Sequence, residues 1–124
     1  MIGYVTLGTC DLHRAAAFYD DLLGLLGARR AFETERFIAW GAGSQGGLLA
    51  VAAPFDGAAA TVGNGVMVAL SAPDPDTVDR VYARALELGG ADAGPAGPRG
   101  AGGFYAGYFR DLDGNKLNAF CYRR

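Results

Sequence analysis

The first half of the chain alternates between strand-like and helix-like patterns of apolar residues. Residues 2–7 form a short β-rich run, and from 12 to 26 the apolar residues recur at helical spacing until Gly27. The positions that set this spacing are Leu12, Ala15, Ala16, Tyr19, Leu22, Leu23 and Leu26. Three strand-like runs follow, at residues 28–33, 36–41 and 48–53. This pattern predicts a strand, a helix and three further strands.

The second half repeats the pattern after a linker at residues 54–65. A strand is predicted at 67–70 and a helix at 78–88. The segment 92–103, rich in Gly, Pro and Ala, is predicted to be a loop, either a lid or simply mobile. The chain closes with two apolar runs, 104–110 and 116–122, on either side of a polar Asp-Gly turn, which is typical of a β-hairpin.

A shift of 63 residues brings the two halves into register. Over 25 positions this shift gives eight identities, which include the helix-capping candidates Asp11 and Asp74. The other identities are Val5 with Val68, Leu7 with Leu70, Tyr19 with Tyr82, Leu23 with Leu86, Leu25 with Leu88, Gly27 with Gly90 and Ala28 with Ala91. The sequence therefore predicts one α+β domain, 1–124, made of two β-α-β-β-β modules at about 1–53 and 66–124.

Composition narrows the class of protein. The chain has 124 residues, 51 % of them hydrophobic, and a formal net charge of −2, as in ordinary globular proteins. It has no basic patch for nucleic acid, no apolar run long enough for a membrane helix and no signal-peptide pattern, so a cytoplasmic location is expected. The two cysteines, Cys10 and Cys121, become neighbours if the first and last strands pair, but reduced thiols are expected.

Two motifs resemble one protein family. The opening GYVTLGTCDLHRAAAFYDDLLGLLGA and the closing YFRDLDGNKLNAF are similar to the first helix unit and the last hairpin of the vicinal oxygen chelate superfamily, with Leu112 in place of the usual hairpin proline. This superfamily includes glyoxalase I, extradiol dioxygenases and bleomycin- and fosfomycin-resistance proteins. The resemblance implies two βαβββ modules whose curled mixed sheets enclose a pocket, and relatives of this length commonly form homodimers.

The resemblance also implies a divalent metal, bound by His, Glu or Gln on the concave faces of the sheets. The positions that match the usual ligands are Tyr4 and Met67 on the first strands and Asn118 on the last strand, with Ala50 as its first-module counterpart. None of these side chains is a standard ligand of such a metal. We therefore expect no metal site and no cofactor, and His13, in the first turn of a helix, does not replace the missing ligands.

A ligand pocket is the remaining candidate. Tyr4 and Thr6 alternate onto one face of their strand, as Lys116, Asn118 and Phe120 do on theirs. By the resemblance, Tyr108 and its counterpart Trp40 also line the pocket. The predicted ligand-binding residues are Tyr4, Thr6, Trp40, Met67, Tyr108 and Asn118. The alternative is that some of these side chains simply fill the core.

Two functions remain open at this point. The first is a metal-free member of the superfamily that binds a small organic molecule and has no catalytic residues. The second is an enzyme, either a metal-dependent glyoxalase-like lyase or a ring-cleaving dioxygenase, and it depends on the family resemblance alone. A metal-free enzyme that uses Tyr4 or Tyr108 as acid or base also stays open.

Overall fold

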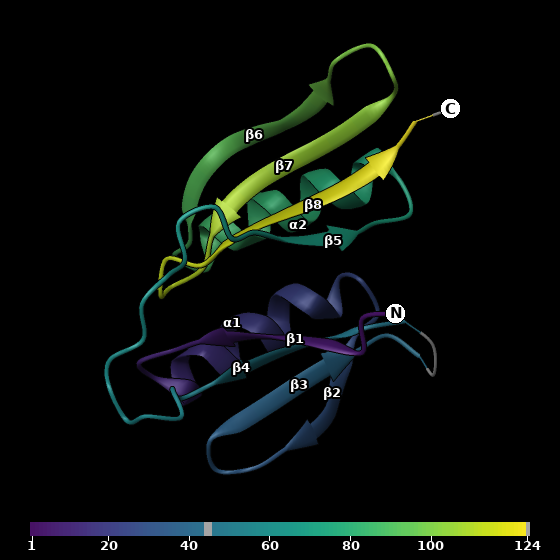
Figure 1. The fold of residues 1–124 in the computed structure, drawn as a ribbon. Helices are drawn as coiled ribbons and strands as arrows, with labels where there is room; N and C mark the ends of the chain where they lie inside the picture. Colours follow the sequence, from purple (N-terminus) through teal and green to yellow (C-terminus); the bar gives the residue numbers. More distant parts are fainter. Residues whose placement is uncertain (44–45, 124) are drawn as a thin grey trace. The chain divides into compact units, whose positions relative to one another are not determined.

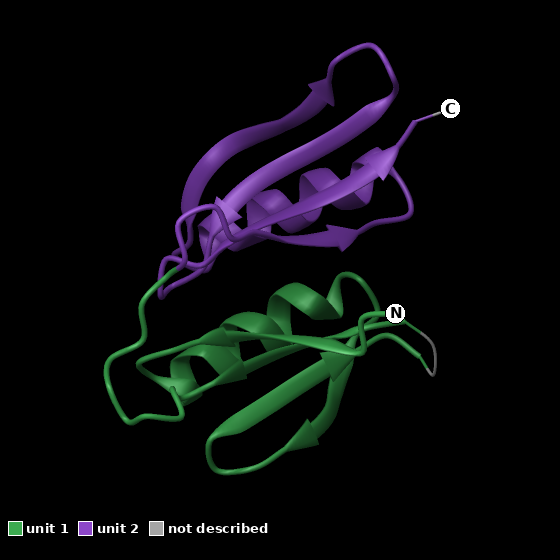
Figure 2. Cartoon of the chain, in the orientation of Figure 1, with its two compact units in different colours: residues 1–62 green, residues 63–124 purple. Residues whose placement is uncertain are grey.

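The computed structural model describes residues 1–43 and 46–123. The chain divides into two compact units, Met1–Val62 and Gly63–Arg124 (Figure 2). Each unit consists of one helix and one four-stranded sheet (Figure 1). Among the described residues, no helix is long and apolar enough to cross a membrane.

Unit 1 contains sheet A and helix α1. Its elements are β1 (Tyr4–Gly8), α1 (Leu12–Gly24), β2 (Arg29–Glu33), β3 (Phe37–Gly41) and β4 (Leu48–Ala52). The strand order is β1-β4-β3-β2, in which β1 runs parallel to β4 and the other neighbours are antiparallel.

Unit 2 contains sheet B and helix α2. Its elements are β5 (Val68–Ser71), α2 (Pro75–Glu87), β6 (Ala91–Arg99), β7 (Phe104–Arg110) and β8 (Lys116–Tyr122). The strand order, β5-β8-β7-β6, repeats that of sheet A, again with one parallel pair at the first strand. The prediction of two βαβββ modules is confirmed, and neither sheet closes on itself.

The helices begin where the sequence predicts a cap. The side chain of Asp11 accepts a hydrogen bond from the Arg14 backbone N–H at 3.0 Å, and that of Asp74 accepts one from the Thr77 N–H at 2.8 Å. Each carboxylate satisfies a donor that the first helical turn leaves without an intrahelical partner. The 63-residue shift places the ends of α1 on those of α2 residue for residue, since 12 + 63 = 75 and 24 + 63 = 87.

Each helix covers one face of its own sheet with apolar side chains. In unit 1, Tyr19 and Leu22 of α1 and Val51 of β4 are fully buried. In unit 2, β7 approaches α2 so closely that a Cβ on Gly107 would lie 3.0 Å from the Cβ of Tyr82. The other face of each sheet is free of its helix, and we call these surfaces the helix-free faces of sheets A and B.

One expectation needs correction. The segment predicted as a loop, 92–103, is largely strand β6, and only its end forms a turn before β7. Strand β6 lies at the edge of sheet B and shifts register on both sides of Gly94, so it tolerates Pro95 and Pro98, which cannot donate hydrogen bonds. The first and last strands belong to different sheets, and Cys10 and Cys121 are both free thiols, in agreement with the expectation of reduced cysteines.

Candidate functional site

Two of the predicted residues share the helix-free face of sheet A. Tyr4 and Thr6 lie two positions apart on β1 and pair in register with Leu48 and Ala50 of β4. The Tyr4 side chain is 61 % exposed, and its ring makes an edge-to-face contact with Phe37 at 6.1 Å. Strand β3 therefore adds an aromatic residue to this face that the sequence did not single out.

Trp40 lies on the opposite face, in the core beneath α1. Its indole Nε1–H donates a hydrogen bond to Asp20 of α1 at 2.8 Å, and its ring centroid lies 5.6 Å from that of Tyr19. It is Ala39 that pairs with Ala50 and so occupies the position equivalent to Tyr108. The sequence prediction matched Trp40 with Tyr108 as equivalent positions of the two modules, and this match was wrong by one residue. In a strand, a shift of one residue moves a side chain to the other face.

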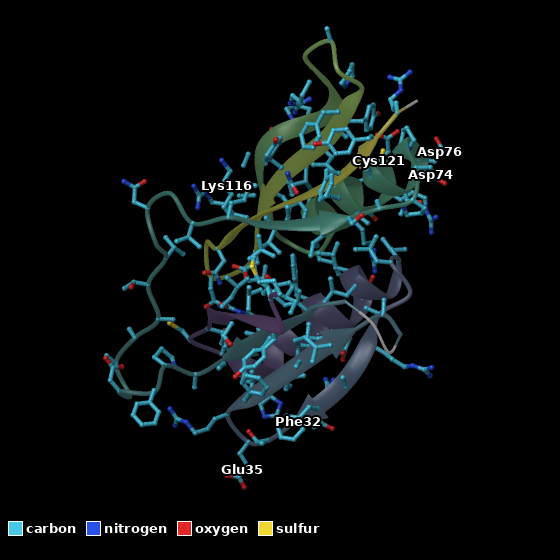
Figure 3. The ribbon with its side chains drawn as sticks, turned by 45° about the vertical axis from the view of Figure 1, so that its right-hand side comes forward. Phe32, Glu35, Asp74, Asp76, Lys116 and Cys121 are labelled. Atoms are coloured by element: carbon cyan, nitrogen blue, oxygen red, sulfur yellow. The ribbon has the colours of Figure 1, made fainter. Side chains whose placement is uncertain are left out.

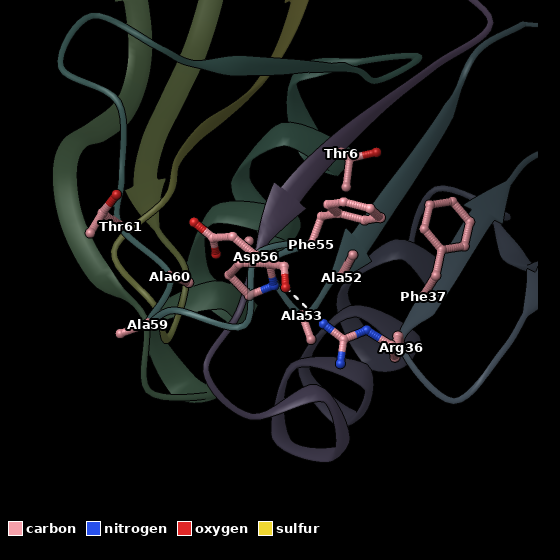
Figure 4. A pocket seen from close by; sticks show the side chains of 12 residues that line it. Thr6, Arg36, Phe37, Ala52, Ala53, Phe55, Asp56, Ala59, Ala60 and Thr61 are labelled. Atoms are coloured by element: carbon pink, nitrogen blue, oxygen red, sulfur yellow. Dashed lines mark hydrogen bonds between the residues drawn. The ribbon is translucent and has the colours of Figure 1, made fainter.

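A hollow of about 540 Å³ opens on the helix-free face of sheet A (Figure 4). The strands form its floor, and the segment that follows β4 forms its wall. Its strand residues are Thr6, Gly8, Phe37 and Ala52, next to Arg36 and Ala53, and its wall consists of Pro54, Phe55, Asp56, Ala59, Ala60 and Thr61. All of these residues belong to unit 1, and most of them are apolar or small.

The hollow has few polar groups, and they include one positive and one negative charge. Arg36 donates a hydrogen bond from Nη2 to the Pro54 carbonyl oxygen at 2.7 Å, which ties the wall segment to the β2–β3 turn (Figure 4). The Asp56 carboxylate accepts a hydrogen bond from the Ala58 N–H at 2.9 Å. The ring of Phe55, which also lines the hollow, is entirely exposed to solvent. The hollow thus combines an apolar floor with a cation, an anion and an unsupported aromatic ring.

On sheet B, the helix-free face carries Asn118 beside Tyr108. The two residues pair in register between β8 and β7, and Asn118 pairs with Ala69 on its other side. Asn118 is only 1 % exposed, and its Oδ1 has no hydrogen-bond partner. A buried acceptor without a partner is uncommon in native proteins, so it needs an explanation.

Two cations lie against the ring of Tyr108. The guanidinium carbon of Arg99 and the Nζ of Lys116 are each 5.5 Å from the ring centroid, a favourable cation–π distance. Lys116 lies at the start of β8 (Figure 3). Met67 precedes β5 and is 39 % exposed, at a position that alternates onto the same face as Ala69. The structure therefore brings Tyr4 together with Thr6, and Tyr108 together with Asn118.

The residues present do not fit a divalent metal. Among the described residues, no three His, Cys, Asp or Glu side chains lie close enough together to hold an ion. Asn118 supplies a single amide oxygen, and the neighbouring positive charge on Lys116 opposes a metal cation there. Tyr4 and Met67 add only a phenol and a thioether at the other first-strand positions.

The shifted pKa values of unit 2 belong to groups on the other side of sheet B. Hydrogen bonding to Asp79 raises the pKa of the Tyr105 phenol, and burial with a hydrogen bond to Asp92 raises that of Tyr82. Burial raises the pKa of the Cys121 thiol, which lies towards the start of α2 (Figure 3). A neutral buried thiol is a poor nucleophile, in keeping with an apolar filler.

Comparison with known proteins identifies the family. The model of the Glyoxalase/Bleomycin resistance protein/Dioxygenase superfamily matches residues 1–119. The chain belongs to this superfamily. No curated protein matches the chain.

Several solved structures of the superfamily are similar to the chain. A glyoxalase/bleomycin resistance protein from Albidiferax ferrireducens T118 is 33 % identical, covers 97 % of both chains and has a TM-score of 0.89. A glyoxalase-related enzyme from Fulvimarina pelagi is 25 % identical over 97 % of this chain and 86 % of its own, with a TM-score of 0.75. A lactoylglutathione lyase from Agrobacterium tumefaciens, 22 % identical over 97 % and 92 %, has a TM-score of 0.70 and supports the fold alone.

The hairpin motif of the superfamily has a structural role in this chain. The buried carboxylate of Asp111 accepts hydrogen bonds from the backbone N–H groups of Asp113 and Asn115, both at 2.9 Å, and from Asn115 Nδ2 at 3.0 Å. Leu112 takes the place of the motif's usual proline without breaking this turn. The turn therefore fixes the start of β8, on which Asn118 lies.

Sequence reasoning missed the residues that build the hollow. Strand alternation did not indicate Phe37, because counting from Trp40, which the sequence placed on this face, puts Phe37 on the opposite face. Arg36, Phe55 and Asp56 lie in a turn and a linker, where no periodic signal indicates which side chains meet. Arg99 lay within the segment predicted as a loop, so its approach to Tyr108 could not be expected.

Proposed function

We propose that the protein binds a small organic molecule in the hollow of unit 1 and uses no metal at the superfamily's ligand positions. The main support for the proposal is the hollow itself, which has a volume of about 540 Å³. Ligand sites typically enclose about 300–1,000 Å³ and are mostly apolar, with a small number of polar groups that orient the ligand. The hollow has both properties.

The chemistry of the lining favours a neutral or weakly polar ligand. Arg36 and Asp56 contribute opposite charges, so the hollow has no net charge to recruit an ion. Phe37 and the exposed ring of Phe55 offer aromatic surface, and Thr6 offers a hydroxyl group. A ligand with a ring and one or two hydrogen-bonding groups would remove the apolar surface from water and still satisfy these polar groups.

The alternative, a metal-dependent lyase or dioxygenase, has only superfamily membership in its favour. Family membership is a weak guide to chemistry, because sites on one fold diverge. The side chains at Tyr4, Met67 and Asn118 also do not form a suitable donor set. No specific observation supports the enzymatic alternative.

The test uses N-phenyl-1-naphthylamine, a neutral aromatic probe whose fluorescence rises in apolar surroundings. We expect saturable binding to the parent protein and loss of that binding in Thr6→Phe, since the new ring fills the floor of the hollow. Thr6→Val is the matched control, because it removes only the hydroxyl group and keeps the volume. Equal binding by the parent protein and Thr6→Phe would refute the hollow as the site.

Elemental analysis tests the metal-free part of the proposal separately. We expect less than one-tenth of an equivalent of divalent metal per chain, about the level of contamination, after purification without chelators. One tightly held equivalent that a chelator removes with loss of stability would overturn this part and favour the enzymatic alternative.

A further inference from the structure

The helix-covered side of sheet A contains a groove that the proposed function does not use. This groove, which we call the α1 groove, has a volume of about 310 Å³ and lies between the first half of α1 and the β2–β3 hairpin. Its apolar floor consists of Leu12, Ala16 and Ile38, and the last two are buried. Ile38 lies two residues before Trp40 and therefore on the same face of β3, opposite to the hollow.

The guanidinium group at the rim of the α1 groove is already bound by carboxylates. Arg30 is the one lysine or arginine among the described residues that line the groove. Its Nε and Nη2 donate hydrogen bonds to Asp20 at 3.0 and 2.8 Å, and its Nη1 donates one to Glu33 at 2.7 Å. Each of its nitrogens is directed at a carboxylate, so the guanidinium has little left to offer an anionic ligand.

Negative charge exceeds positive charge around the groove. Glu35, in the turn between β2 and β3, also lines the groove and forms no ion pair with another described residue (Figure 3). Together with the two carboxylates that bind Arg30, it leaves an excess of two negative charges. His13 adds an imidazole and Thr34 a hydroxyl group, each of which contains an atom that accepts hydrogen bonds. The rim therefore suits a cation that donates several hydrogen bonds.

The donor set and the floor together favour an organic cation over a metal ion. His13, Glu33 and Glu35 all line the groove, but no three such side chains among the described residues lie close enough together to hold an ion. A metal ion would also leave the apolar floor exposed to water. An ammonium group on a short apolar body would bind to the rim and cover the floor, which removes apolar surface from water. The volume of the groove is at the lower end of the range for ligand sites, which begins at about 300 Å³.

We infer that the α1 groove binds a small organic ammonium ion. The ammonium group of the ligand lies at the carboxylate of Glu35 and donates a second hydrogen bond to His13. Its apolar part covers Leu12 and Ile38. This site is on the opposite face of sheet A from the hollow and does not depend on the proposed function.

The test compares two probes that differ in charge. Benzylammonium chloride has one aromatic ring and a primary ammonium group, and benzyl alcohol has the same ring with a neutral hydroxyl group. Both are titrated against isotope-labelled Thr6→Phe, in which the hollow is filled, and backbone amide shifts are followed by NMR. We expect saturable shifts at His13, Thr34 and Glu35 with benzylammonium, and binding of benzyl alcohol that is weaker by about fivefold. Added salt should weaken benzylammonium binding and leave benzyl alcohol unchanged.

Variants locate the charge that is responsible. Glu35→Gln keeps the shape of the side chain and removes its charge, so it weakens benzylammonium by about fivefold, the size of one partly exposed charge contact, and leaves benzyl alcohol unchanged. Glu87→Gln is the matched control, because it makes the same change at an exposed glutamate on α2, and it leaves both probes unchanged. His13→Arg places a cation in the groove and removes benzylammonium binding, whereas the neutral His13→Gln retains it. Circular dichroism verifies that each variant is folded.

Four results would overturn the inference. They are the absence of saturable shifts with benzylammonium, equal affinity for the two probes, equal losses in Glu35→Gln and Glu87→Gln, and shifts that spare both α1 and the β2–β3 turn. The third result would mean diffuse attraction to surface carboxylates. All four leave the proposed function intact, because the hollow is tested by a different probe in the parent protein. Conversely, failure of N-phenyl-1-naphthylamine to bind the parent protein would refute the hollow and not the α1 groove.

Discussion

Replacing Asn118 by leucine should stabilise the protein. In the parent protein the amide oxygen is buried with no partner, which costs about 1–3 kcal/mol relative to a satisfied group. Leucine has a similar branched shape and needs no hydrogen bond, so it removes this cost on a face already lined by Phe120 and Ala69. Strain from fitting the leucine side chain offsets part of this gain, so we expect a net increase of about 1–2 kcal/mol in the free energy of unfolding.

Urea unfolding followed by far-UV circular dichroism measures this change. A gain of about 1–2 kcal/mol raises the midpoint by about 0.5–1 M. The control is Asn115→Leu, the same substitution at a buried asparagine whose backbone and side-chain N–H groups bond to Asp111. It should lower stability, because it disrupts a satisfied network. If Asn118→Leu also lowers the midpoint, the reasoning that the buried oxygen of Asn118 destabilises the folded protein fails.

Two further predictions concern stability. Asp111→Ala leaves the backbone and side-chain N–H groups of Asn115 without their acceptor, and should cost about 2–4 kcal/mol in the urea experiment; a loss below 1 kcal/mol would contradict it. The hydrogen bond from Arg30 lowers the pKa of the Asp20 carboxyl below its ordinary value of 3.8. The ionised carboxylate therefore stabilises the folded protein above about pH 3.8, and this contribution is lost as the pH falls below that value. Asp20→Asn should therefore flatten the decline of stability in acid, measured by thermal unfolding between about pH 5 and pH 2.5, and an unchanged slope would exclude this ion pair as a cause.

Local signals were sufficient to predict most of the fold from the sequence. Asp11 and Asp74 mark helix starts because their carboxylates satisfy free N–H groups of the first turn, an effect that does not depend on tertiary structure. The Asp-Gly turn predicts the last hairpin for a similar reason, since its hydrogen bonds lie within five residues. Homodimer formation and a cytoplasmic location stay predictions.

The errors came from places where distant partners decide the structure. Strand β6 contains two prolines and several glycines, and only its pairing with β7 makes it a strand. Trp40 was assigned to the wrong face because the two hairpin loops differ in length, and a single residue of misalignment reverses a side chain. The hollow could not be predicted, because Arg36 and Pro54 are 18 residues apart and both lie outside the strands.

Proline in β6 has a consequence for how the protein meets other chains. As the outer strand of sheet B, β6 would normally offer its free N–H and C=O groups to any extended segment in solution. Pro95 and Pro98 have no N–H to offer, and the Arg99 side chain already occupies carbonyl oxygens on the same strand. This border of the sheet is thereby closed to strand addition, which protects the molecule from growth into aggregates along that side.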